Sequence, residues 1–148
     1  FGTAAVQSLS TGQVAVLTTS QIVSLTTAQV PALTTLQIRA LTTSQITSME
    51  TNDLQSFSTT QIPALRTDLI KALSTDQVAV LTTSEFASLV TTQLQSFTTN
   101  QMVSLTSNQL AALTTAQLPA FTSVQVNALT TSQLYGWTAS RINALYVG

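Results

Sequence analysis

The stretch LTTSQIVSLTTAQVPALTTLQIRALTTSQI, from Leu17 to Ile46, writes nearly the same eight residues again and again. The register extends outward in both directions without an insertion, so that Leu, Phe, Met or Trp occurs at every eighth position from Phe1 to Leu145. Residues 1–148 therefore form one array of 18 full octads and a partial one. Positions within an octad are counted here from this large apolar residue.

The other columns of the array are almost as regular. Position 6 is always apolar, and position 8 is small or Val. Position 3 is Thr or Ser in 17 of 19 octads, and position 5 is Gln in 13 of 18. The consensus is Leu-Thr-Thr-x-Gln-Ile-x-Ala, in which positions 1, 6 and 8 are predicted to line a core.

The columns favour one short helical turn in each octad. Thr, x, x and Gln at positions 2 to 5 resemble a capping box, but position 2 also accepts Glu50, Arg66 and Val90. The Thr of position 3 is therefore predicted to be the N-cap, with the turn over positions 4 to 8. Pro31 and Pro63 at position 7 exclude a long helix.

Seven of the nine charges agree with this direction of the helical turn, and Glu50 and Arg141 do not. Negative charge is favoured at the start of a helix and positive charge at its end. The acids at the predicted starts are Asp53, Asp68, Asp76 and Glu85. Arg39, Lys71 and Arg66 are assigned to the late part of their octads.

The predicted fold class is an all-α repeat, a solenoid or superhelix of one-turn helices with one helix per octad. A turn of five or six residues is unstable alone because helix nucleation is costly, so neighbouring turns must stack. The Gln of position 5 is expected to bond across repeats to a backbone group. The alternative is a β-solenoid with Thr and Gln ladders, which Thr, Val and Ile favour. The lack of strict alternation and of regularly placed turn residues opposes it.

Two groups of residues stand out as possible contacts between subunits. The final stretch, LYGWTASRINALYVG, brings together Tyr135, Trp137 and Tyr146. Residues 135–148 are predicted to be an atypical C-terminal cap, with a docking patch as the alternative. The octad LRTDLIKA lacks the Gln and carries the charged residues Arg66, Asp68 and Lys71.

The composition argues against most chemistry. There is no His and no Cys, only 6% of the residues are charged, and the net charge is −1. The commonest general base and thiolate nucleophiles are missing, so no enzyme, cofactor or metal site is predicted. No field would attract nucleic acid, and no apolar run approaches the ~18 residues of a membrane span.

The octads LTTSQIVS, LTTAQVPA and LTTSQITS resemble arrays in large secreted bacterial proteins described as adhesin-like. The resemblance implies export, an extracellular or cell-surface setting, and a structural or adhesive role. We expect a structural repeat that associates with itself and forms or joins a filament, sheath or surface fibre. The alternative is an adhesin stalk or binding module for a glycan, a surface or ice.

Overall fold

A computed structural model of the chain describes residues 2–146. Within that range the chain consists of short helices and turns and contains no β-strand. The predicted all-α repeat is therefore confirmed, and the alternative β-solenoid is not supported. Phe1, Val147 and Gly148 lie outside the described residues, and so does the end of the cap predicted at 135–148.

Most octads form a single α-helix of four to six residues. The α-helices are α1 (Thr3–Gln7), α2 (Thr11–Ala15), α3 (Thr19–Val23), α4 (Thr35–Ala40), α5 (Thr43–Ser48), α6 (Thr51–Leu54), α7 (Thr67–Ala72), α8 (Thr75–Val80), α9 (Thr83–Ala87), α10 (Thr91–Ser96), α11 (Thr99–Ser104), α12 (Ser107–Ala111), α13 (Ser123–Ala128) and α14 (Ala139–Tyr146). The octads with proline end in 3₁₀ turns instead: η1 (Val30–Ala32), η2 (Ile62–Ala64) and η3 (Leu118–Ala120).

The helices begin one residue earlier than predicted, which corrects the assignment of the N-cap. Position 2 is the N-cap, as in α11, where the Thr98 hydroxyl accepts a hydrogen bond from the Gln101 N–H at 3.2 Å. Thr99, at position 3, is the first helical residue. The position-2 residues that argued against this assignment, such as Glu50 and Arg66, are N-caps without a side-chain cap bond. Their octads form helices because tertiary packing, rather than the cap, supplies most of the stability.

The prolines change the type of turn, as their chemistry requires. Proline disfavours the α conformation in the residue before it and has no N–H to donate. Around Pro31 the chain closes through i→i+3 bonds, from the Ala32 N–H to the Gln29 carbonyl and from the Leu33 N–H to the Val30 carbonyl. The octad keeps its length, so the repeat continues in register on the far side.

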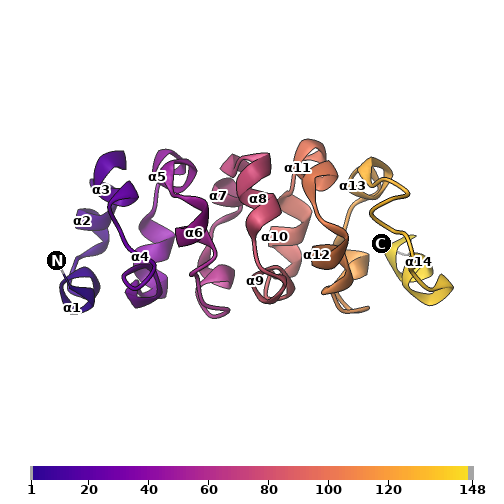
Figure 1. Cartoon of the computed structure of the whole chain (residues 1–148), viewed down its shortest axis with the longest axis horizontal. Helices are drawn as coiled ribbons and strands as arrows, with labels where there is room; N and C mark the ends of the chain where they lie inside the picture. Colours follow the sequence, from indigo (N-terminus) through magenta and orange to yellow (C-terminus); the bar gives the residue numbers. More distant parts are fainter. Residues whose placement is uncertain (1, 147–148) are drawn as a thin grey trace.

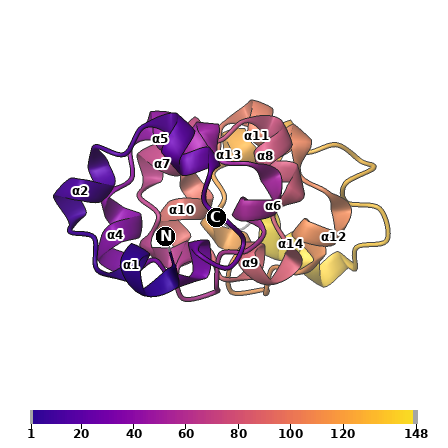
Figure 2. The ribbon, with the colours of Figure 1, turned by 60° about the vertical axis from the view of Figure 1, so that its left-hand side comes forward.

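The octads wind into a superhelical rod whose ends lie far apart along the long axis (Figure 1). Helices three octads apart pack together: α7 touches α10, and α8 touches α11. Hydrogen bonds between turns join residues 28 and 31 positions apart. Three octads contain 24 residues and four contain 32, so one superhelical turn takes between three and four octads. Figure 2 shows successive turns lying one behind another around the axis.

The core is one continuous column of apolar side chains along the rod. Position 6 is buried in every octad from Val6 to Val126, and position 1 is buried from Leu33 to Phe121. Position 8 is mostly half-buried, which agrees with its small side chains. The predicted core of positions 1, 6 and 8 is therefore confirmed. The structure adds position 5, whose polar side chain is also buried from Gln37 onward in most octads.

Candidate functional site

The position-5 glutamine closes a capping box at the start of its own helix. In α11 the Gln101 Oε1 accepts a hydrogen bond from the Thr98 N–H at 2.9 Å, while the Thr98 hydroxyl accepts one from the Gln101 N–H. Two backbone donors that the helix start leaves unpaired are thereby satisfied. The box also holds the amide rigidly, so that its Nε2 points away from the helix to which it belongs.

The same amide joins its octad to the preceding turn of the superhelix. The Gln101 Nε2 donates to the carbonyls of Ile70 and Leu73, both at 2.8 Å. Pairs of carbonyls in the preceding turn likewise accept from the other members of this set, which we call the glutamine ladder: Gln37, Gln45, Gln61, Gln77, Gln93, Gln101, Gln109, Gln117, Gln125 and Gln133. The two carbonyls lie 31 and 28 residues earlier in each case except Gln117, which reaches the carbonyls 30 and 28 residues earlier. The hypothesis that Gln bonds across repeats to backbone groups is confirmed, and the partner lies one superhelical turn earlier.

Every polar atom of a ladder amide therefore has a partner although the side chain is buried. Gln101 is 2% exposed, its oxygen accepts one bond and its nitrogen donates two. A buried polar group that is fully paired adds specificity, whereas an unpaired one costs about 1–3 kcal/mol. The ladder consequently determines which carbonyls of the earlier turn each octad is bonded to, and this pairing sets the register between turns.

Arg141 replaces the ladder glutamine in the last full octad and makes the same two contacts. Its Nη1 donates to the Leu113 carbonyl at 2.9 Å and its Nη2 to the Leu110 carbonyl at 3.1 Å. These acceptors lie 28 and 31 residues earlier, as they do for glutamine. The guanidinium also lies 4.3 Å from the centre of the Trp137 ring, which is a favourable cation–π contact.

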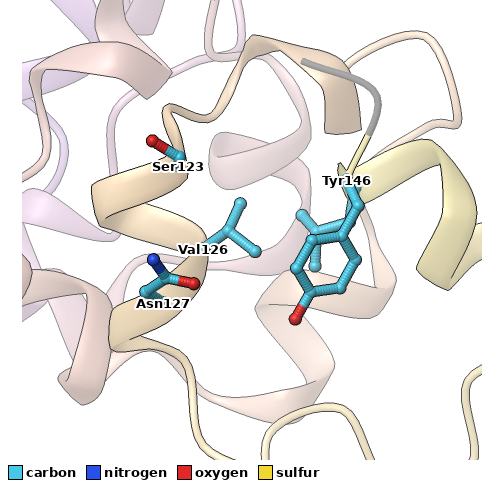
Figure 3. Close-up of a pocket in the computed structure, with 5 residues that line it drawn as sticks. Ser123, Val126, Asn127 and Tyr146 are labelled. Atoms are coloured by element: carbon cyan, nitrogen blue, oxygen red, sulfur yellow. The ribbon is translucent and has the colours of Figure 1, made fainter.

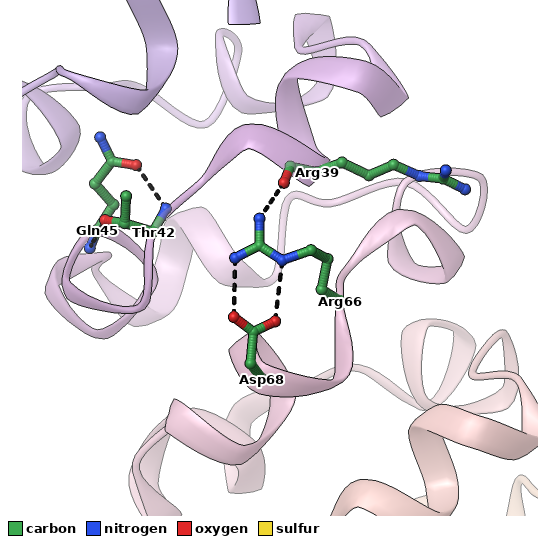
Figure 4. Close-up of polar contacts among 5 residues, drawn as sticks. All are labelled: Arg39, Thr42, Gln45, Arg66 and Asp68. Atoms are coloured by element: carbon green, nitrogen blue, oxygen red, sulfur yellow. Dashed lines mark hydrogen bonds and ion pairs between the residues drawn. The ribbon is translucent and has the colours of Figure 1, made fainter. Parts of the chain in front are cut away.

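Leu69 also replaces the ladder glutamine, and here a different residue supplies the link between turns. Arg66, at the N-cap of α7, donates to the Arg39 carbonyl in the preceding turn and to both carboxylate oxygens of Asp68 (Figure 4). Arg66 therefore lies at the start of its helix, and its predicted late placement is wrong. Its hydrogen bond lowers the pKa of the Asp68 carboxyl. Sequence reasoning noticed this octad but could not place the carbonyl that Arg66 reaches.

Two further departures are buried acids, and burial disfavours their charged form. Desolvation, followed by the neighbouring charge of Glu50, raises the pKa of Asp53. Burial also raises the pKa of Glu85, against the hydrogen bonds from Thr82, which lower it. The predicted acids do lie in the first turns of α6, α7, α8 and α9, and Arg39 and Lys71 do lie in the last turns of α4 and α7.

The aromatic residues predicted as contacts are divided between two hollows. Tyr135, 89% exposed, lines a hollow of about 360 Å³ with Trp137, Arg141 and Asn108. Tyr146 lines a separate hollow of about 50 Å³ on the side of α13 (Figure 3).

Tyr146 is 62% exposed, and its ring faces Val126 across that hollow, with Ser123 and Asn127 on the helix opposite. Lys71 is exposed on α7. The structure shows these side chains to be accessible. Their role as contacts between subunits stays a prediction.

The first turn of the rod holds glutamines whose amide nitrogens have no acceptor among residues 2–146. Gln13 and Gln21 are exposed, although their oxygens accept the N–H groups of Ser10 and Thr18, both at 2.8 Å. The boxes are therefore formed and their donors are aimed as in the ladder.

The polar groups of the described range are arranged for hydrogen bonding between octads. Residues 2–146 contain no cluster of three or more acidic, His or Cys side chains that could hold a metal ion. In the same range no helix is long and apolar enough to cross a membrane. What the geometry can do is join the octads of one superhelical turn to those of the preceding turn, and this is the site on which a function must rest.

The sequence profile of the ALTTAQ repeat matches residues 1–27, 46–83 and 107–145, which together cover well over half of the chain. The chain belongs to the ALTTAQ repeat family. Residues 112–117 read ALTTAQ, and the structure gives a role to each part of the motif. Leu113 fills the core, the Thr114 hydroxyl accepts a hydrogen bond from the Gln117 N–H, and Gln117 is a member of the ladder. Searches among curated proteins and among solved structures gave no match.

Proposed function

We propose that this ALTTAQ array is a structural protein that associates with itself and forms or joins a filament, sheath or surface fibre. The observation that carries the proposal is the complementarity of the two end turns of the rod. One end presents aimed amide donors and half-buried leucines. The other presents backbone carbonyls that no amide of the described residues reaches.

The N-terminal turn offers the donor half of a ladder contact. The Nε2 groups of Gln13 and Gln21 are held by their capping boxes and have no acceptor in the described range. Leu9 and Leu17, in the core column, are only half-buried, whereas the equivalent leucines from Leu33 onward are buried. A further turn placed against this end would bury the leucines and accept the amides.

The C-terminal turn offers the acceptor half. The last described ladder bonds reach Met102 and Leu105 from Gln133, and Leu110 and Leu113 from Arg141. The corresponding carbonyls of the next two octads, Val126 and Leu129 among them, receive no such bond within residues 2–146. A contact between unlike ends does not close on itself and generates a fibre.

The surface suits close packing of identical chains. Positions 3 and 4 are occupied by exposed Thr, Ser and other small residues, and the net charge is −1. Proteins with a net charge near zero associate more readily because little repulsion keeps them apart. An extracellular or cell-surface setting is part of the proposal, and its support is the resemblance of the octads to bacterial secreted arrays.

Negative-stain electron microscopy and sedimentation velocity of the 148-residue chain test the proposal. We expect rods that lengthen with protein concentration. The double variant Gln13→Leu and Gln21→Leu should shift this growth to concentrations at least about tenfold higher, because two buried contacts lose their donors, at roughly 1.4 kcal/mol per tenfold change. Gln95→Leu is the matched control, since Gln95 is exposed in α10 and far from either end.

Unchanged growth of the double variant would contradict end-to-end stacking through these amides. Rods that stay single at every concentration would contradict self-association altogether. That second result would favour the other candidate, an adhesin stalk that presents a binding surface.

A further inference from the structure

Glu85 holds a buried side-chain oxygen that has no partner. Within residues 2–146 its Oε1 is the only buried side-chain nitrogen or oxygen atom for which no hydrogen bond is found. The residue is 2% exposed and lies in the first turn of α9. It occupies position 5, where the octads that follow carry a ladder glutamine. The unpaired oxygen thus belongs to a residue at a ladder position.

The capping box determines which oxygen of Glu85 faces the preceding turn. Oε2 accepts the Thr82 N–H at 2.7 Å and the Thr82 hydroxyl at 3.0 Å, as the oxygen of a ladder glutamine does. Oε1 therefore takes the place of the amide nitrogen. Ladder nitrogens donate to carbonyls 31 and 28 residues earlier, which for Glu85 are those of Leu54 and Phe57.

An ionised carboxylate at this place would be destabilised by its neighbours. The carbonyls of Leu54 and Phe57 are acceptors, so a carboxylate oxygen would face two like partial charges with no donor between them. Burial adds the cost of removing a charge from water. A protonated carboxyl removes both problems, because its O–H can donate to one of the two carbonyls.

We propose that Glu85 carries a proton in the folded rod and that its Oε1–H donates to the carbonyl of Leu54 or Phe57. The proton comes from the solvent when the octad docks, and it returns there when the carboxyl ionises. In acid, Glu85 then reproduces one of the two bonds of a ladder glutamine. As the pH rises the bond is lost, and the joint between α9 and the preceding turn loosens. The rod thereby contains one link that responds to pH.

A proton suits this place better than a metal ion. In the neighbouring octads the amide nitrogen lies 2.7 and 2.8 Å from its two carbonyl oxygens, as Gln93 shows. An ion between Oε1 and a carbonyl would need about 2.3 Å or more on each side, and therefore roughly 4.6 Å between the two oxygens. The ladder spacing leaves room only for a hydrogen bond.

The charged groups on the packed elements do not oppose this assignment. α12 packs on α9 and contains no charged residue. The octad of η3 also contacts this part of the chain, because its Gln117 donates to the Ala87 and Leu89 carbonyls, and η3 contains no charged residue. The preceding turn carries Asp53 in α6 and Glu50 at its N-cap, both negative. No positive charge is therefore present on these elements to hold Glu85 ionised. Burial raises the pKa of the Glu85 carboxyl above its usual value of 4.5.

Because folding raises the pKa of Glu85, this residue makes the stability of the rod fall as the pH rises. A carboxyl whose pKa is raised by folding binds more protons in the folded state than in the unfolded state. Its stabilising contribution is complete below pH 4.5 and is lost as the pH rises through the higher folded value. Glu85→Gln removes this dependence and supplies both amide bonds at every pH.

Two measurements on the 148-residue chain test the proposal. Glu50 and Glu85 are its only glutamates, so labelling with ¹³C-glutamate gives two carboxyl signals, and the signal that is lost in Glu85→Gln is that of Glu85. We expect the Glu85 signal to titrate clearly above the usual glutamate value of 4.5. We also expect Glu85→Gln to raise the Tm by about 2–4 °C at pH 8, a gain that diminishes towards pH 4.

Asp76→Asn is the matched control, because it removes the same charge from an exposed position in the neighbouring helix α8. It should leave the difference in Tm between pH 4 and pH 8 as it is in the unaltered chain. Titration of the Glu85 signal at or below the usual value of 4.5 would overturn the proposal. So would a Tm gain from Glu85→Gln that is independent of pH. A rise in the Tm of the unaltered chain at pH 8 on adding Ca²⁺ or Na⁺, absent in Glu85→Gln, would show that a cation occupies the place instead.

Discussion

Residues 49–88 and residues 89–136 follow the same superhelical path but are joined to the preceding turn in different ways. In the later region every octad contributes a ladder glutamine, from Gln93 to Gln133. In the middle region every second octad lacks it, at Asp53, Leu69 and Glu85. The core column is buried in both regions as far as Val126. The apolar spine therefore builds the superhelix, and the ladder determines how firmly one turn is held to the next.

The middle region compensates for its missing glutamines with other donors. Arg66 reaches the Arg39 carbonyl, and the Gln55 Nε2 donates to the Val80 carbonyl at 2.8 Å. Neither bond has the double geometry of the ladder, and Glu85 has no substitute donor at all. Charge is concentrated in the same region, which holds seven of the nine charged residues of the chain. The middle region thus has fewer ladder glutamines than the later region and more titratable side chains.

The largest expected effect comes from making a later octad resemble the Leu69 octad. Gln109→Leu removes the partners of the Thr106 N–H and of the Val78 and Leu81 carbonyls. Arg141, the arginine that reaches α12, already donates to the Leu110 and Leu113 carbonyls. At about 1–3 kcal/mol for each buried group left unpaired, and with some relief from relaxation, we expect a loss of about 2–4 kcal/mol of unfolding free energy. Urea denaturation measures it.

Gln95→Leu is the control for this change, since Gln95 is exposed and should alter stability by no more than about 0.5 kcal/mol. Equal effects of the two substitutions would mean that the ladder amides contribute nothing beyond their surface. The difference between the two regions would then have no energetic meaning.

A smaller effect tests the corrected position of the N-cap. Thr98 caps α11 through its hydroxyl, whereas Val90, the cap residue of the preceding helix α10, has no hydroxyl to do so. Thr98→Ala should cost about 1 kcal/mol, and Val90→Thr should gain a similar amount. Thermal unfolding compares both with Thr99→Ala, which should change the stability little because Thr99 is the first helical residue. A larger loss for Thr99→Ala would restore position 3 as the cap.

The smallest effect concerns the exposed ion pair of the middle region, in which Arg66 and Asp68 lie 2.9 Å apart. Because the pKa of Asp68 is lowered by folding, its contribution is present at neutral pH and is lost as the pH falls below the usual value of 3.8. Asp68→Asn should cost less than about 1 kcal/mol at low salt, and 1 M NaCl should reduce that cost. A cost that salt does not change would indicate a role in packing. Glu85 acts in the opposite direction with pH.

Much of the architecture could be predicted from the columns of the sequence. The period, the single turn per octad, the apolar positions and the helix-start acids all depend on contacts within about eight residues, which a repeat displays directly. The N-cap was misplaced because three unsuitable residues, Glu50, Arg66 and Val90, occupy position 2. Those residues are tolerated there because packing between turns maintains their helices. The glutamine was recognised as a link, but its acceptors could not be named.

What the sequence by itself determined is the repeating unit: one short helix in every eight residues, with a core face that needs neighbours. Only the tertiary structure decided which neighbours these are. The number of octads per turn depends on the rotation at each link, added over some 28 residues, and no local pattern records that sum. The same sum places the Arg66 guanidinium at the Arg39 carbonyl and the Glu85 carboxyl opposite Leu54 and Phe57. In each case the superhelical winding determines which residue lies opposite the side chain, and proximity in the sequence does not.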